Sequence, residues 1–282
     1  MNLTVPTIRE AKRLRWIQTD AEARPARISK LALIHEVAIM RADPSAEFRT
    51  ESAAARHGVT SSLFIRAFKK LTGISPQRFH AALRIERAKH LLIDTTRSVT
   101  DISFDVGYNS LGTFVRTFTL LVGLSPTQLR HFARGENVEL AIFDVPMARI
   151  EQIRPGLRAA IVNPPADRLL AAGLFPQSLP AGLPFDGCFI DPACGCFELR
   201  WATSRENANL LAASVSLDSI QDAWAGRFGS INVCSRRVSR EEADHVRSIQ
   251  LHLRPLAETD PPFLTPVPLL LILQSRQEAA AA

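Results

Sequence analysis

The sequence predicts two domains, an all-α domain of about seven helices followed by a β-rich, sandwich-like arrangement of short strands. Three observations lead to this fold class. A stretch of the first half returns in altered form fifty residues later, the first half carries apolar residues at helical spacing, and the second half has short extended runs between Pro- and Gly-rich turns. A chain of 282 residues is long enough for about two cores.

The repeat is the clearest feature of the chain. Residues 58–76 read GVTSSLFIRAFKKLTGISP, and residues 107–126 read GYNSLGTFVRTFTLLVGLSP. Aligned without gaps over their last thirteen residues, the copies match at positions that include Phe64/Phe114, Arg66/Arg116, Phe68/Phe118, Gly73/Gly123, Ser75/Ser125 and Pro76/Pro126. Each copy joins a glycine, a turn, an amphipathic helix, a second glycine and Ser-Pro. This order is typical of the second half of a helix-turn-helix motif and its exit.

The elements before the first copy follow from caps and periodicity. Residues 1–29 are rich in Arg and broken by two prolines, which predicts a basic flexible arm, either without a role or contacting a polyanion backbone. Apolar spacing predicts a helix over residues 28–40. A short helix follows, which we expect Thr50 to cap and Gly58 to end.

The first copy predicts a helix over residues 61–71, capped by Thr60. The apolar stripe that we expect in the core comprises Leu63, Phe64, Ala67, Phe68 and Leu71. The opposite face carries Ser61, Ser62, Ile65, Arg66, Lys69 and Lys70. Small polar groups near the N-terminus of a helix and cations further along suit entry into a DNA major groove with flanking phosphate contacts. An ordinary solvated face is the alternative.

The second unit repeats the plan after a long helix over residues 76–92, which Pro76 begins. Ser98 opens a short helix that Gly107 ends, and a second amphipathic helix covers residues 111–121. Its apolar stripe is expected to be Thr113, Phe114, Thr117, Phe118 and Leu121. Its outer face is expected to be Gly112, Val115, Arg116, Thr119 and Leu120. A last short helix, residues 126–132, leads into a Gly-Glu-Asn linker.

These residues resemble the AraC/XylS family of bacterial transcription regulators. The resemblance lies in A-x-x-x-G-V-x-x-S-x-x-x-R-x-F-K-K-x-x-G-x-S-P at residues 54–76, LRIERAKHLL at residues 83–92, and VTDISFDVGYNSLGTFVRTF followed by G-L-S-P. It covers roughly residues 31–132 and implies seven helices, with two helix-turn-helix units joined by the long central helix. It further implies that one chain places two helices in successive major grooves, about 34 Å apart.

The resemblance also assigns candidate DNA contacts. It implies base reading by Ser62, Ile65 and Arg66 in the first copy, and by Gly112, Thr113 and Arg116 in the second. Ser61 and Lys69 suit phosphates, and Thr119 stands where the first copy has Lys69. In the second copy Thr119-Leu120 replaces the basic pair common in the family, so we expect copy one to read sequence and copy two mainly to position the protein.

Charge supports a polyanion partner for the first half only. Residues 1–139 hold 21 Lys and Arg against 13 Asp and Glu, a net +8, whereas the remainder holds 13 against 15, a net −2, and no lysine. The N-terminus has no apolar run typical of a signal peptide, and the apolar tract at residues 263–273 is too short to span a bilayer. We expect a cytoplasmic, nucleoid-associated protein without a membrane partner.

The second half predicts a β-rich domain, and the domains are placed at residues 30–135 and 138–276. A helix is expected over residues 241–246. Strands are expected at residues 168–175, 197–202, 210–215, 230–235 and 249–253. GLFPQSLPAGLPFDG and TDPPFLTPVPLLLIL resemble the C-terminal domains of some regulators of this family whose DNA reader comes first. Most members have the reverse order.

We predict that the chain is not an enzyme and uses no cofactor. It contains no phosphate loop, no Gly-x-Ser-x-Gly and no HExxH motif. Cys188, Cys194 and Cys196 lie within nine residues, so a soft metal site or thiol sensor is conceivable, but free or packed thiols are favoured. Four of the seven histidines, at positions 57, 80, 90 and 131, show no ligand spacing and are expected at the surface or at caps.

The predicted function is a sequence-specific DNA-binding transcription regulator that responds to a ligand. Its predicted partners are double-stranded promoter or operator DNA, an unidentified small-molecule effector, RNA polymerase and a second copy of the chain. One alternative is a constitutive regulator whose C-terminal domain is only an interaction module. Another is a thiol- or metal-responsive stress or repair regulator that uses the cysteines.

Overall fold

The computed structural model describes residues 27–135, 156–201, 203–216, 220–227, 229–245 and 248–266. Most of the predicted basic arm, residues 1–26, lies outside these ranges. Both ends of the predicted C-terminal domain, residues 138–155 and 267–276, lie outside them as well.

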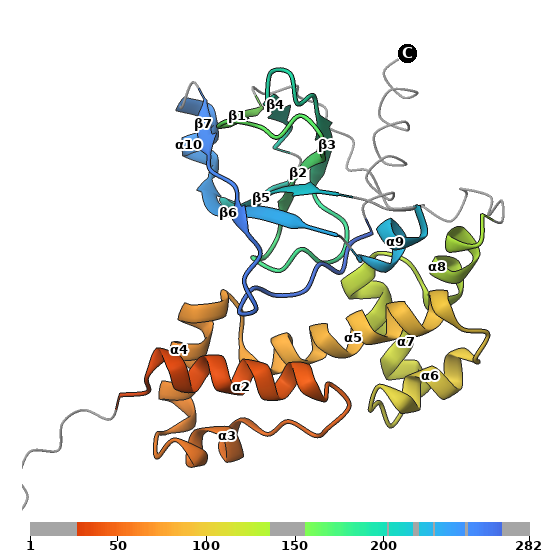
Figure 1. The fold of residues 1–282 in the computed structure, drawn as a ribbon. Coiled ribbons are helices and arrows are strands. Elements are labelled where there is room, and N and C mark those ends of the chain that lie inside the picture. Colours follow the sequence, from red (N-terminus) through yellow and green to blue (C-terminus); the bar gives the residue numbers. More distant parts are fainter. Residues whose placement is uncertain are drawn as a thin grey trace, which may run out of the picture.

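Seven helices occupy the described residues 27–135, the number expected for the first domain. They are α2 (Lys30–Ala42), α3 (Thr50–Arg56), α4 (Ser61–Thr72), α5 (Pro76–Asp94), α6 (Val99–Asp105), α7 (Leu111–Val122) and α8 (Pro126–Ala133). Helix α5 runs through the middle, with α2 to α4 at one end and α6 to α8 at the other (Figure 1). The two copies of the repeat therefore lie at the two ends of one helix.

Local chemistry sets the ends of these helices. The hydroxyl of Thr60 accepts a hydrogen bond from the Leu63 N–H at 3.3 Å and so caps α4, as predicted. Gly73 and Gly123 end α4 and α7 with φ of 83° and 90°, a left-handed conformation that favours glycine. The expected cap at Thr50 is wrong. Arg49 is the N-cap residue of α3, and Thr50 is turned into the core, 1% exposed.

The described residues of the second half form two sheets around a common core. Its strands are β1 (Leu157–Ile161), β2 (Leu169–Phe175), β3 (Asp186–Ile190), β4 (Cys196–Leu199), β5 (Asn207–Val215), β6 (Ile231–Ser239), β7 (Ile249–Leu251) and β8 (Arg254–Pro255). One sheet has the order β4-β1-β7 and the other β3-β2-β5-β6-β8, and every pairing is antiparallel except β1 with β7. Buried side chains of both sheets, such as Leu157 and Leu210, share one cluster. This matches the sandwich-like prediction.

The described residues of the β-rich part also contain two short helices, α9 (Ile220–Ala225) and α10 (Arg240–His245). The expected helix at residues 241–246 is α10, and the five expected strands correspond to β2, β4, β5, β6 and β7. Strands β1, β3 and the two-residue β8 were not predicted. The segments of β1 and β3, LRAAI and DGCFI, are short and lack a clear alternation of apolar and polar residues.

Apolar side chains join the two parts of the chain. Leu179, Trp224 and Leu264 belong to the β-rich part by sequence, yet they are buried in the cluster formed by the helices. The Trp224 ring stacks on Phe132 of α8 with 5.3 Å between ring centroids. The helical and β-rich parts therefore share part of one core, with the β-rich part on one side of α5 (Figure 1).

Hydrogen bonds from cationic side chains of the helices also connect the helical part to the β-rich part, at what we call the junction. Arg41 donates from Nε to the Glu258 carbonyl and from Nη2 to the Asp260 carbonyl, both at 2.8 Å. Lys89 is fully buried in α5 and donates to the Phe263 carbonyl at 3.2 Å. Burial lowers the pKa of Lys89 to about 7. At 0% exposure the Lys89 amine relies on the Phe263 carbonyl and on the charge of nearby Glu86, so the junction is sensitive to how these groups are placed.

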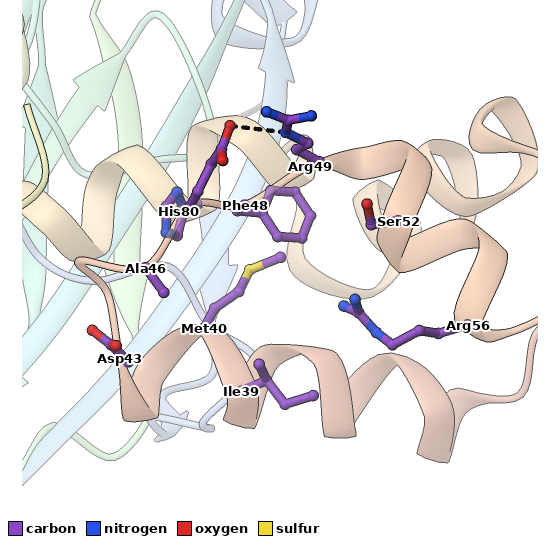
Figure 2. Close-up of a pocket in the computed structure, with 10 residues that line it drawn as sticks. Ile39, Met40, Asp43, Ala46, Phe48, Arg49, Ser52, Arg56 and His80 are labelled. Atoms are coloured by element: carbon purple, nitrogen blue, oxygen red, sulfur yellow. Dashed lines mark hydrogen bonds and ion pairs between the residues drawn. The ribbon is translucent and has the colours of Figure 1, made fainter. Parts of the chain in front are cut away.

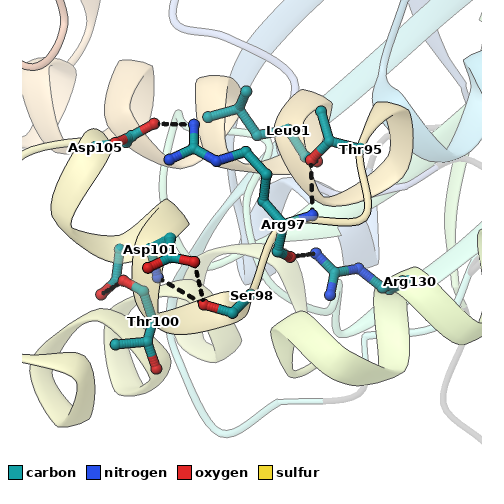
Figure 3. A network of polar contacts seen from close by, with 9 residues as sticks. Leu91, Thr95, Arg97, Ser98, Thr100, Asp101, Asp105 and Arg130 are labelled. Atoms are coloured by element: carbon teal, nitrogen blue, oxygen red, sulfur yellow. Dashed lines mark hydrogen bonds and ion pairs between the residues drawn. The ribbon is translucent and has the colours of Figure 1, made fainter.

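A network of polar contacts surrounds the loop between α5 and α6, where the second helix-turn-helix unit begins (Figure 3). Arg130 of α8 donates to the Leu92 carbonyl at 3.0 Å and to the Arg97 carbonyl at 2.6 Å. The Arg97 guanidinium pairs with Asp105 at the end of α6, and Ser98 caps the start of α6 through the Asp101 N–H at 3.0 Å. These contacts tie three helices to one loop, so the second unit has a defined orientation on α5.

One histidine corrects the expectation of surface or capping roles. His80 of α5 is buried, 7% exposed, at the edge of a cavity of about 540 Å³ between α2, α3 and the loop that joins them (Figure 2). The Phe48 ring lies against it, with 5.6 Å between centroids. Burial, with Arg84 adding to it, lowers the pKa of His80 to about 4. The imidazole is therefore neutral in the folded protein at neutral pH.

We expect the neutral state of His80 to make the fold weaker in mild acid. Its pKa is 6.5 in an unperturbed chain and about 4 in the fold, so between these pH values the unfolded chain binds one more proton and the free energy of unfolding falls as pH falls. From pH 6.5 to pH 4, the free energy of unfolding of His80→Gln should fall by about 3 kcal/mol less than that of the wild-type chain. Urea unfolding at both pH values measures this. Equal losses in the two proteins would contradict the assignment.

Candidate nucleic-acid interface

Helix α4 is held to the core by a stripe of aromatic rings. Phe64 and Phe68 are both 0% exposed, and the Phe68 ring meets Phe79 of α5 edge to face at 5.6 Å between centroids. An aromatic pair of this geometry adds to the free energy gained by burying the rings. The packing fixes the rotation of α4 about its axis, so its opposite face must point away from α5.

The outward face of α4 carries the predicted DNA-contacting side chains of the first copy. Ser62, Arg66 and Lys69 are exposed, and the spacing of four and three residues places them in one line. Ser61 and Ile65 flank this line and are half-buried. Within the described part of the chain, Arg66 and Lys69 form no ion pair. Their cations are thus available to a ligand.

Helix α7 repeats this arrangement with a less polar outer face. Phe114 and Phe118 are 0% exposed, and Tyr108 packs edge to face on Phe114 at 5.3 Å. The outer face holds Gly112, Thr113, Arg116, Thr119 and Leu120, all exposed. Thr113 therefore belongs with the outer face and not with the apolar stripe. Thr119 uses its hydroxyl within the helix, donating to the Val115 carbonyl at 2.8 Å.

The turns that precede both helices depend on glycine. Gly58 and Gly107 adopt φ of 61° and 85°, and each lets the chain reverse between the two helices of its unit. Around Gly58 there is open space. A Cβ on Gly107 would lie 2.6 Å from the Ser45 carbonyl oxygen and 2.8 Å from the Arg84 guanidinium, so this turn is also a point of close approach.

The helical half of the chain is similar to known proteins. A family model described as a helix-turn-helix domain matches residues 53–131, the stretch that runs from α3 into α8. Residues 53–131 form a helix-turn-helix domain of the AraC type. The AraC-type domain thus contains both α4 and α7.

Curated relatives match the AraC-type domain. The chain is 41% identical over 64 residues to an uncharacterised HTH-type transcriptional regulator, YobQ, of Bacillus subtilis, covering 23% of this chain and 27% of the relative. It is 31% identical to the lactose operon transcription activator of Staphylococcus xylosus, covering 34% of this chain and 35% of that one. The chain thus spans about a third of the length of these relatives.

Among solved structures, the DNA-binding domain of AdpA in complex with a target DNA is similar to this chain. The identity is 28%, and the match covers 37% of this chain and 94% of that domain with a TM-score of 0.36. An AraC-type regulator from Chromobacterium violaceum matches at 25% identity, with 39% and 96% of the two chains covered and a TM-score of 0.34.

One segment of the β-rich part contacts the C-terminal ends of both α4 and α7. Ser178 lies against Gly73, and the Gly182 N–H donates to the Leu121 carbonyl at 2.6 Å. A cavity of about 360 Å³ lies between this segment, α5 and α7, with Leu120, Leu121 and Leu179 in its wall. Sequence reasoning missed these contacts, because no local pattern relates residues 178–182 to the repeat.

The cysteines do not form a metal centre in the described residues. All four thiols are free, and Cys194 and Cys196 are exposed at the turn into β4. Cys188 is half-buried on β3, and burial raises its pKa to about 12, so its thiol is protonated at neutral pH. In the described ranges no three His, Cys, Asp or Glu side chains could hold a metal ion. None of the described helices is long and apolar enough to cross a membrane.

The two turn glycines provide a matched pair for testing the AraC-type domain. Gly58→Ala should lower the free energy of unfolding by about 1–2 kcal/mol, because alanine must adopt a positive φ. Gly107→Ala should lower it by at least about 2 kcal/mol more, because its methyl group also meets a backbone oxygen and a guanidinium. Urea unfolding of both variants makes the comparison. Equal losses would show that the close approach at Gly107 is unimportant.

Proposed function

We propose that this chain is a sequence-specific DNA-binding transcription regulator that reads two successive major grooves. The observation that carries the proposal is the pair of helices α4 and α7, each held by buried phenylalanines at one end of α5, with its opposite face exposed. Two helices on one rigid spacer suit binding sites one helical turn, about 34 Å, apart. The regulator names of its relatives support the same conclusion.

We propose that α4 and α7 contribute unequally to the recognition of DNA sequence. Ser62, Ile65 and Arg66 on α4 would read bases, with Arg66 donating to guanine, while Ser61 and Lys69 hold phosphates. On α7, Gly112, Thr113 and Arg116 occupy the reading positions, and only Arg116 has a side chain long enough for a bidentate base contact. Thr119 already satisfies its hydroxyl inside the helix. Copy two would therefore mainly position the protein.

Ligand responsiveness is proposed to act through the junction of the two parts. The cavity beside Leu120 and Leu179 contacts α7 and the segment that also reaches the end of α4. A small apolar effector bound there would favour one arrangement of the segment, provided that it binds that arrangement more tightly. The division into a reader at residues 30–135 and an effector-binding or dimerisation domain at residues 138–276 is part of this proposal. RNA polymerase and a second copy of the chain are its further proposed partners.

The thiol-responsive alternative is the weaker one. A sensor thiol needs an accessible thiolate, and burial raises the pKa of Cys188, so a thiol response would rest on the two exposed cysteines, Cys194 and Cys196. The constitutive alternative differs from the proposal only in whether a ligand fills the junction cavity. Thermal unfolding of the full chain with a metabolite library separates the two, because a bound effector raises the midpoint.

Arg66 is the residue whose replacement should affect specificity most. Arg66→Ala should weaken binding to a selected site by about 1–3 kcal/mol, because the guanine contact is lost. On random DNA the loss should be smaller, since only a charge is removed. Fluorescence anisotropy with both DNAs at one salt concentration measures the ratio.

Arg66→Lys is the matched control, because it keeps the charge and removes the bidentate donor. It should bind random DNA like the wild-type chain and still lose affinity for the selected site. If Arg66→Ala weakens both DNAs equally and Arg66→Lys weakens neither, Arg66 is only a phosphate contact and the proposed reading role is wrong.

A further inference from the structure

A cleft of about 570 Å³ separates the end of α4 and the start of α5 from strands β5 and β6. Four cations line it from the two parts of the chain, Lys69 and Arg78 on the helical side and Arg205 and Arg237 on the other. Asn207 and Asn209 of β5 add amide groups. No Asp or Glu is among the described residues that line the cleft.

The cations in this cleft are not neutralised within the described part of the chain. Lys69, Arg78, Arg205 and Arg237 are all exposed, and none of them forms an ion pair there. Arg78 donates one hydrogen bond to the neutral Gln177 side chain at 2.5 Å, and Arg205 lies over the Phe185 ring at 6.0 Å. Other arginines of the β-rich part behave differently, since Arg236 pairs with Glu242 and Arg158 with Glu198. The cleft thus holds close together four cations that are unpaired in the described residues, whereas carboxylates pair with arginines at other places in the β-rich part.

The start of α5 adds to the positive potential. Ser75 is its N-cap residue, but the Ser75 side chain makes no capping hydrogen bond, so the first N–H groups of a 19-residue helix lack that partner. The N-terminus of a helix carries a partial positive charge and favours anions. Four cations, two amides and this helix end together suit a phosphate, whose oxygens accept several charge-assisted hydrogen bonds at once.

The position of Lys69 indicates which phosphate this is. Ser62, Arg66, Lys69 and Gly73 are spaced by four, three and four residues, so they form one line along α4. That line begins with the proposed base-reading side chains and ends in the wall of the cleft, at Lys69 and Gly73. A DNA strand bordering the groove that α4 enters would therefore pass into the cleft.

We propose that the cleft binds backbone phosphates of the DNA read by α4, so that Arg205 and Arg237 of the β-rich part belong to the DNA interface. This inference rests on the proposed function and extends it to the second domain. The contacts carry no sequence information. They add affinity and salt dependence on every DNA.

The test compares two double variants of the full chain that remove the same charge. In Arg205→Ala/Arg237→Ala, affinity for selected and random DNA should fall by a similar factor, about ten- to sixtyfold at 0.1 M salt, and the slope of log K against log salt should decrease by up to about 1.8. Arg158→Ala/Arg236→Ala is the control, and Arg236 is paired on the other face of β6. It should bind both DNAs like the wild-type chain.

Three results would overturn the inference while leaving the proposed function in place. One is unchanged affinity and slope in the cleft variant, with a wild-type chain that binds its site and depends on Arg66. Another is tighter DNA binding by the cleft variant. The third is stabilisation by pyrophosphate that only the cleft variant loses, with unchanged DNA binding, which would assign the cleft to a free phosphate compound. Failure of the wild-type chain to select any DNA would instead contradict the proposed function, before any variant is made.

Discussion

The packing of two phenylalanines from each repeat against the helical core is the constraint on which the rest of the structure depends. Phe64 and Phe68 hold α4, and Phe114 and Phe118 hold α7, all without exposure to solvent. Each pair fixes the rotation of its helix, and α5 fixes the separation of the two helices. Which side chains face outward is therefore decided by burial on the opposite side. The proposed reading roles of Arg66 and Arg116 follow from this geometry, and so does the unequal chemistry of the two faces.

The sequence predicted this helical half well because its signals are local. Apolar spacing, the cap at Thr60 and the glycine ends lie within a few residues of the features that they determine. Thr50 does not cap α3, because its side chain is buried in the core. Thr113 was predicted on the apolar face but lies on the outer face, and threonine is compatible with either environment. Contacts between residues that are far apart in the sequence have no such local signal. The residues around Trp224 do not predict its contact with Phe132, and those around Arg205 and Arg237 do not predict that they share a cleft with Lys69.

The junction makes the two parts of the chain depend on each other. Trp224 and Leu264 complete the helical core, and the Lys89 amine, whose pKa burial lowers to about 7, relies on a carbonyl of residue 263. Segment 178–182 reaches the ends of both α4 and α7. Any change in the β-rich part that moves this segment would alter the surroundings of both helices. This arrangement suits regulation by a ligand or by a partner chain, and it also places the cationic cleft beside the exposed face of α4.

Selection of bound sequences from a random DNA library by the purified full chain tests the central claim most directly. The account predicts two selected elements about 10 base pairs, one helical turn, apart, with the element read by α4 more strongly specified than the one read by α7. Repeating the selection with Arg116→Ala should leave the stronger element intact. A single element, two equally specified elements, or loss of the stronger element in the Arg116 variant would contradict the account.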